Sequence, residues 1–221
     1  MKNLPRASWS LALGFVLAVP SFAALPKSVG TSPSSARAEW RLPHFLRLAE
    51  SDPARLIRVS NLLISEDRIR QASADATKAF DWQHRVAAMT ALSAFFDPDP
   101  QISKHVTGTH RREAREILQK TLASDPSLLV RDAVVESLRR ILRMQPGEAK
   151  LWKRSLETAF LDRKNVIQGE GLFIRETILT ALREGSMKPS SGVWAAAKRD
   201  KSAPVRNVLH AWDTSAYDSV N

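Results

Sequence analysis

The chain contains no cysteine, so it has no disulfide bonds, no thiolate ligands and no lipid-attachment cysteine. Burial of apolar side chains must therefore hold the fold together. Glycine is scarce as well, with eight residues in 221. The short run Gly169-Glu170-Gly171 does not make a phosphate-binding or dinucleotide-binding loop, and no nucleophile elbow occurs. These absences favour a non-catalytic protein, with no catalytic residue and no cofactor assigned.

Metal-ligating side chains are not clustered along the sequence. His105 and His110 are the closest pair of histidines, but their five-residue interval across Gly108 does not put both on one face of a helix. The acids of Asp97-Pro98-Asp99-Pro100 lie in a rigid turn, and a calcium loop needs several more oxygen ligands in register. We expect no metal site, and we interpret this turn as a loop between helices.

The N-terminus has the pattern of a cleavable secretory signal. Lys2 and Arg6 precede the apolar run 9–19, which Pro20 ends before the small residues of Ser21-Phe22-Ala23. The run is shorter than the roughly 20 residues that span a bilayer, which argues against a membrane anchor. We therefore predict a signal peptide over residues 1–23, no transmembrane segment in the mature chain, and export to the periplasm or outside of a bacterial cell.

A strong positive charge remains after the predicted signal is removed. The formal net charge of the whole chain is +10, and the signal carries only Lys2 and Arg6 of its charged residues. Such a charge favours acidic proteins, anionic envelope polymers, phosphate-rich lipid headgroups or nucleic acid, and it also serves solubility alone. Residues 24–43 are rich in proline and serine, which predicts a flexible linker before the folded part.

From His44 onward, apolar residues recur at helical spacing and no strand is indicated. The clearest helix follows Asp125-Pro126, where Val130, Val134 and Leu138 lie on one side and Asp132, Glu136, Arg139, Arg140 and Arg143 fill the other. An upstream helix has Thr109 as its expected N-cap. The expected helices, taken in pairs, are 45–50 with 54–63, 65–78 with one that includes 84–92, 110–123 with 128–143, 150–161 with 172–183, and 193–198 with 203–212.

An internal repeat links these pairs. An aspartate is followed six residues later by an arginine that stands behind a β-branched residue, in Asp52 with Arg58, Asp125 with Arg131, and Asp200 with Arg206. Arg85 and Arg175 match these arginines without the aspartate, because Ala79 and Gly169 stand in its place. Recurrence of one residue pattern along a chain is typical of stacked helical repeats, whose terminal copies depart from the pattern.

The segment 125–138, Asp-Pro-Ser-Leu-Leu-Val-Arg-Asp-Ala-Val-Val-Glu-Ser-Leu, resembles the second helix of a HEAT repeat. The resemblance implies an all-α fold, a short α-solenoid of about four to five HEAT-like helix pairs over residues 44–214, followed by a tail over 215–221. In that family the aspartate caps the turn, and the arginine reaches an acid of the next repeat. The resemblance implies these ladder roles for Asp52, Arg58, Arg85, Asp125, Arg131, Arg175, Asp200 and Arg206.

A repeat array of this kind predicts a scaffold that binds a protein or an anionic envelope polymer along one extended face. If second helices line the inner curve, as the resemblance implies, that face carries Arg139, Arg140, Arg143 and Arg183, which are our candidate partner-binding residues. A solvated basic face is the competing interpretation. Oligomeric state does not follow from the sequence.

Two other interpretations remain open. Tryptophans beside basic residues, at Trp40, Trp82, Trp152, Trp194 and Trp212, can stack on nucleic acid, although filling the gaps between repeats is the more common use. Some HEAT-like proteins of similar size and charge are alkylpurine DNA glycosylases, which makes a DNA-binding enzyme the alternative function. The predicted secretory signal argues against DNA repair.

Overall fold

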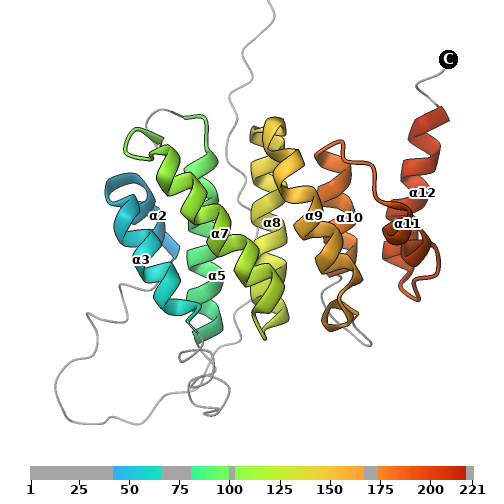
Figure 1. The fold of residues 1–221 in the computed structure, drawn as a ribbon, viewed down its shortest axis with the longest axis horizontal. Coiled ribbons are helices and arrows are strands. Elements are labelled where there is room, and N and C mark those ends of the chain that lie inside the picture. Colours follow the sequence, from blue (N-terminus) through green and yellow to red (C-terminus); the bar gives the residue numbers. More distant parts are fainter. Residues whose placement is uncertain (1–41, 66–80, 100–102, 167–173, 218–221) are drawn as a thin grey trace, which may run out of the picture. The chain divides into compact units, whose positions relative to one another are not determined.

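The chain is all-helical over the part that its computed structural model describes, residues 42–65, 81–99, 103–166 and 174–217, as the sequence predicts. This part contains nine α-helices and no strand (Figure 1). The helices are α2 (Leu42–Ser51), α3 (Pro53–Leu63), α5 (Asp81–Leu92), α7 (Gly108–Ser124), α8 (Leu128–Met144), α9 (Ala149–Leu161), α10 (Ile174–Glu184), α11 (Ser191–Lys198) and α12 (Ala203–Tyr217). Three single 3₁₀ turns join them, η2 (Ser93–Phe96), η3 (Pro146–Glu148) and η4 (Arg163–Asn165).

Some helix ends differ from the sequence predictions. Helix α2 begins at Leu42, within the predicted linker, and α12 runs on to Tyr217, within the predicted tail. The N-cap of α7 is Thr107 and not Thr109, because the Thr107 hydroxyl accepts the backbone N–H of His110 while the His110 ring accepts the N–H of Thr107. The predicted signal peptide, most of the linker and the helix 65–78 lie outside the described residues, apart from Ser65.

Contacts order the helices into two rows. Helices α3, α7, α9 and α11 pack successively on one another, and we call them the first row. Helices α2, α5, α8, α10 and α12 do the same and form the second row. Each first-row helix also packs on the second-row helix that follows it in the chain, as α7 does on α8 and α9 on α10 (Figure 1). The sequence paired α3 as a second helix with α2, whereas its contacts with α7 place it in the first row.

Helix α8 shows why these segments fold as they do. Val130, Val134, Leu138 and Ile141 recur at a spacing near 3.6 and are completely buried. Val135 and Leu142 are buried too, which widens the apolar stripe so that α8 can pack on α5, α7 and α10 at once. Gln145 ends the helix in a non-helical conformation, and η3 begins at Pro146.

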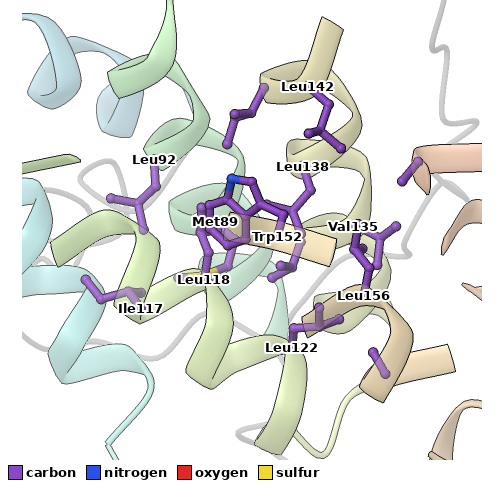
Figure 2. Packing of buried hydrophobic residues seen from close by; sticks show 14 of the residues in the cluster. Met89, Leu92, Ile117, Leu118, Leu122, Val135, Leu138, Leu142, Trp152 and Leu156 are labelled. Atoms are coloured by element: carbon purple, nitrogen blue, oxygen red, sulfur yellow. The ribbon is translucent and has the colours of Figure 1, made fainter. Parts of the chain in front are cut away.

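The centre of the core is the indole of Trp152 on α9. Figure 2 shows it among Met89, Leu118 and Leu138, which come from α5, α7 and α8. Its ring also meets the Phe96 ring edge-on, with the ring centroids 6.5 Å apart. One large side chain thus joins four helices and η2.

None of the described helices combines the length and the apolar character that a membrane span requires.

Trp152→Ala should lower the free energy of unfolding by about 3–5 kcal/mol, because it leaves a cavity where four helices meet. Trp152→Phe should lose less, since the indole Nε1 makes no hydrogen bond in the structure. Urea unfolding followed by circular dichroism measures both losses. A loss below about 1 kcal/mol for the alanine variant would contradict this packing.

Candidate functional site

Arginine side chains connect successive units of the fold. Arg85 on α5 donates two hydrogen bonds to the Asp125 carboxylate in the turn before α8, from Nε at 2.8 Å and from Nη2 at 3.2 Å. Both side chains are buried, with 3% and 1% of their surface exposed. Asp125 Oδ1 also accepts the backbone N–H of Ser127 at 2.8 Å, which orders the start of α8. A buried pair joined by two hydrogen bonds fixes where α5 meets this turn.

Arg131 on α8 reaches the next turn in the same way, but its acceptor there is an amide. Arg131 Nε donates to Asn165 Oδ1 at 2.8 Å, and Nη2 donates to the Lys164 carbonyl at 3.1 Å. Asn165 Nδ2 in turn donates to the Ala159 carbonyl at 2.7 Å, which fixes the amide orientation. Burial lowers the pKa of Arg131, and the negative charges of Asp125 and Asp162 oppose that shift.

The third connection joins α10 to the turn before α12. Arg175 Nη1 forms an ion pair with Asp200 Oδ2, and the Arg175 guanidinium lies 4.2 Å from the centroid of the Phe160 ring. Burial lowers the pKa of Arg175, whereas the Asp200 charge opposes that shift. Arg85, Arg131 and Arg175 therefore each contact the turn of the following unit, at Asp125, Asn165 and Asp200.

The six-residue spacing from aspartate to arginine has a separate explanation. Arg131 Nη1 donates to the backbone carbonyl of Asp125, and Arg206 Nη1 donates to that of Asp200. Each arginine thus holds the carbonyl of its own turn, while the aspartate carboxylate receives the arginine of the preceding unit. The first copy differs, because Asp52 accepts the Arg55 N–H at 3.0 Å as the N-cap of α3 and Arg58 is exposed.

The four candidate partner-binding arginines lie at the exposed side of α8 and α10, and they differ in how they are paired. Arg139 donates to Glu184 from Nε at 3.0 Å and Nη2 at 2.7 Å, and to Glu136 from Nη1 at 2.8 Å. These hydrogen bonds, above all those to Glu184, raise the pKa of Arg139 and lower the pKa of Glu184. Arg139 therefore joins α8 to α10.

The other three arginines keep more exposed guanidinium groups. Arg140 lies 3.4 Å from Asp97 and Arg143 lies 3.6 Å from Glu184, with 46% and 56% of their side chains exposed. Pairs this long and this exposed contribute little stability. Arg183 is exposed and forms no ion pair within the described part of the chain. The available cations on this surface are Arg140, Arg143 and Arg183.

An aspartate with an altered pKa lies beside this group. Asp132 on α8 accepts a hydrogen bond from the Thr177 hydroxyl of α10 at 3.3 Å. Burial and the negative charge of Glu136 raise the pKa of Asp132 to about 6, although the Thr177 hydrogen bond and Arg139 oppose the change. The carboxyl group of Asp132, where α8 meets α10, therefore has a pKa above the usual range of a carboxylate.

Two acceptors of this network were missed by sequence reasoning. The six-residue spacing before Arg175 indicated Gly169, which lies outside the described residues, whereas Asn165 receives the Arg131 guanidinium ten residues before Arg175. Glu184 carries its own signal, because it follows Arg140 by the same 44-residue interval that separates Arg131 from Arg175. An acid one repeat after an arginine-rich position could have indicated the bridge.

One histidine and one acid considered for metal binding have structural roles here. The His110 ring caps α7, and Asp97 Oδ1 accepts the backbone N–H of Asp99 at 3.0 Å. No group of three or more metal-ligating side chains occurs within the described ranges. Trp152 is buried, and the Trp194 and Trp212 rings pack edge-on against each other 6.2 Å apart, whereas Trp40 lies outside the described residues.

Comparisons with protein-family models, with curated proteins and with solved structures found no match to this chain.

Asp125→Ala should lower the free energy of unfolding by about 3–5 kcal/mol, because it leaves Arg85 charged and buried without its carboxylate. Asp52→Ala is the matched control and should lose about 1 kcal/mol, the value of an N-cap alone. Asp125→Asn should fall between them, since an amide accepts an arginine at the equivalent contact of Asn165. Urea unfolding of the three variants gives the order, and equal losses for both alanine variants would contradict the connecting role of Asp125.

The pKa of Asp132 predicts how stability changes with pH. Because its pKa of about 6 in the folded protein exceeds the ordinary value of 3.8, the folded state binds the proton more tightly. The contribution of protonated Asp132 to the free energy of unfolding is complete below about pH 4, and it is lost as the pH rises through 6. Asp132→Asn should therefore be more stable than the wild type above pH 6, by at most about 3 kcal/mol, and nearly equal to it near pH 4. Urea unfolding at both pH values measures this, and a constant difference would contradict it.

Proposed function

We propose that this protein is an exported, non-catalytic scaffold built as a HEAT-like α-solenoid, which holds a protein partner on the exposed face of α8 and α10. The observation that supports a repeat array is the recurrence of one contact at three successive connections, Arg85 with Asp125, Arg131 with Asn165, and Arg175 with Asp200. A repeated joint makes a repeated surface, and such surfaces serve binding. Export is proposed from the sequence of residues 1–23 alone.

The charges of the α8–α10 face favour a protein over a uniform polyanion. Arg140, Arg143 and Arg183 are exposed there, but Glu136 and the half-buried Asp132 lie on the same helix as two of them. A polyanion would be repelled by these carboxylates, whereas a protein can present charges of both signs in matching positions. Arg139 and Glu184 hold each other in place, so these two side chains need little ordering when a partner binds.

A triple variant tests this face. Arg140→Gln, Arg143→Gln and Arg183→Gln remove the three exposed cations and leave the Arg139 bridge intact, and glutamine is as good a helix former as arginine. We expect at least about a tenfold loss of affinity for the envelope partner, with slower association at low salt. The partner is first captured by crosslinking in the envelope fraction, and its affinity for the purified variants is then measured.

A control triple on α9 and η4, Lys150→Gln, Arg154→Gln and Lys164→Gln, removes the same charge and should retain protein binding. Equal losses in both triples would indicate a general charge effect and contradict the proposed face.

N-terminal sequencing of the mature protein should find a start near Ala24, and an intact Met1 on a cytoplasmic protein would contradict export.

A further inference from the structure

The first row carries a different kind of surface from the second. Exposed charged side chains on α3, α7, α9 and α11, with the residue that ends α11, are almost all basic. The one exposed acid among them is Glu116, which lies 4.0 Å from Arg112. The exposed cations are Arg55, Arg58, Arg112, Lys120, Lys150, Arg154, Lys198 and Arg199.

Helix α9 shares this basic character and adds exposed apolar side chains to it. Leu151 and Leu161 each expose 51% of their surface, and Val166, just after η4, exposes 46%. Residues 151, 154, 158 and 161 recur every three or four positions, so they form one stripe of the helix. That stripe contains leucine, arginine, threonine and leucine, and it contains no acid.

Of the cations around this stripe, Lys153 lies 3.9 Å from Glu157, whereas three others have no acidic partner among the described residues. Lys150, Arg154 and Lys164 are exposed and form no ion pair within the described part of the chain. On the second row, by contrast, Arg139 binds two glutamates and Arg140 contacts Asp97. Acids therefore neutralise much of the second row and leave three cations of the α9 surface without ion pairs.

We propose that this surface lies on an anionic lipid bilayer. We call it the α9 face and define it by Lys150, Leu151, Arg154, Leu161, Lys164 and Val166. Cations next to exposed leucines suit a membrane surface, because the cations meet lipid phosphates while the leucines enter the boundary of the acyl chains. The inference goes beyond the proposed function and concerns the opposite row of helices.

Other anionic partners fit the α9 face less well. Nucleic acid is held by cations together with stacking aromatic rings, and the tryptophan of α9, Trp152, is buried on the other side of the helix. An acidic amphipathic helix needs a groove between helices for its apolar side chains. The leucines here lie on the exposed crest of a single helix, and a flat bilayer surface reaches such a crest directly.

Vesicle sedimentation with the full chain tests the charge part of the proposal. The wild type should bind vesicles of equal parts phosphatidylglycerol and phosphatidylcholine, and less so at high salt. The triple Lys150→Gln, Arg154→Gln and Lys164→Gln should bind them at least about tenfold more weakly. The matched triple of Arg140, Arg143 and Arg183 should bind as the wild type does. Since every variant keeps residues 1–41, differences between variants report the folded surface.

The leucines separate a bilayer from other polyanions. Leu151→Ser with Leu161→Ser keeps all the charges and should weaken vesicle binding at least about threefold. If this double variant binds vesicles as well as the wild type does, the bilayer proposal is overturned. A second outcome would also overturn it. In that outcome the protein binds a DNA duplex or polyglutamate through the three cations, whereas its vesicle binding does not depend on them.

The absence of cysteine allows a direct measurement of which row meets the lipid. Thr158→Cys places a single thiol on the stripe between Leu151 and Leu161, and Asn207→Cys places one on the exposed side of α12 in the second row. With an environment-sensitive fluorophore on each thiol, anionic vesicles should shift the emission to the blue at position 158 only. A shift at position 207 alone, or none at position 158, would overturn the proposal. Purified protein and vesicles suffice, so this result is independent of whether the protein partner exists.

Discussion

A buried arginine that reaches forward to the next turn is the contact on which the described fold depends. Arg85, Arg131 and Arg175 each bind an acceptor in the turn of the following unit, at Asp125, Asn165 and Asp200. A buried charge without such a partner is strongly destabilising, so each unit needs the next one in a defined position. Burial of the apolar core, which extends from Phe45 on α2 to Leu209 on α12, supplies the bulk of the stabilisation, whereas the arginines fix the register in which the helices stack.

The same constraint explains why the two rows differ in charge. Several acids of the central units bind arginines, either in the turns, as Asp125 does, or between second-row helices, as Glu184 does. Glu148 on η3 similarly holds Arg115 of α7, with contacts of 2.8 to 3.1 Å. Lys150, Arg154 and Lys164 form no ion pair within the described residues, and they lie on and beside α9, which exposes Leu151 and Leu161. The chain thus has a mixed-charge face on α8 and α10 and a cationic, partly apolar face on α9.

The all-helical class and most of the central helices could be predicted from the sequence. An apolar stripe such as Val130, Val134 and Leu138 recurs with the period of a helix and not with that of a strand. The row of α3 could not, since its residues read equally well as a first or a second helix until its contacts with α7 are known. The 3₁₀ turn with buried Phe95 and Phe96 also has no clear sequence signal, because short apolar runs do not define a period.

The candidate site was predictable only in part. The arginines at 85, 131 and 175 could be predicted from their recurrence in the sequence, but spacing alone could not identify Asn165, because Asn165 stands ten residues before Arg175 whereas Asp125 stands six before Arg131. The sequence likewise gave Arg139, Arg140 and Arg143 as one basic group. Only three-dimensional contacts separate Arg139, which Glu184 and Glu136 hold, from its more exposed neighbours.

The forward direction of the arginine contacts also bears on how the chain matures during synthesis. Arg85 and Asp125 are 40 residues apart in the sequence, and the arginine is made first. At roughly 5–20 residues per second, the guanidinium waits about 2–8 s before its carboxylate has been synthesised. Each unit is therefore completed only by the one that follows it, and a ribosome that stalls within α7 would leave α5 with a charged side chain that has not yet met its acceptor.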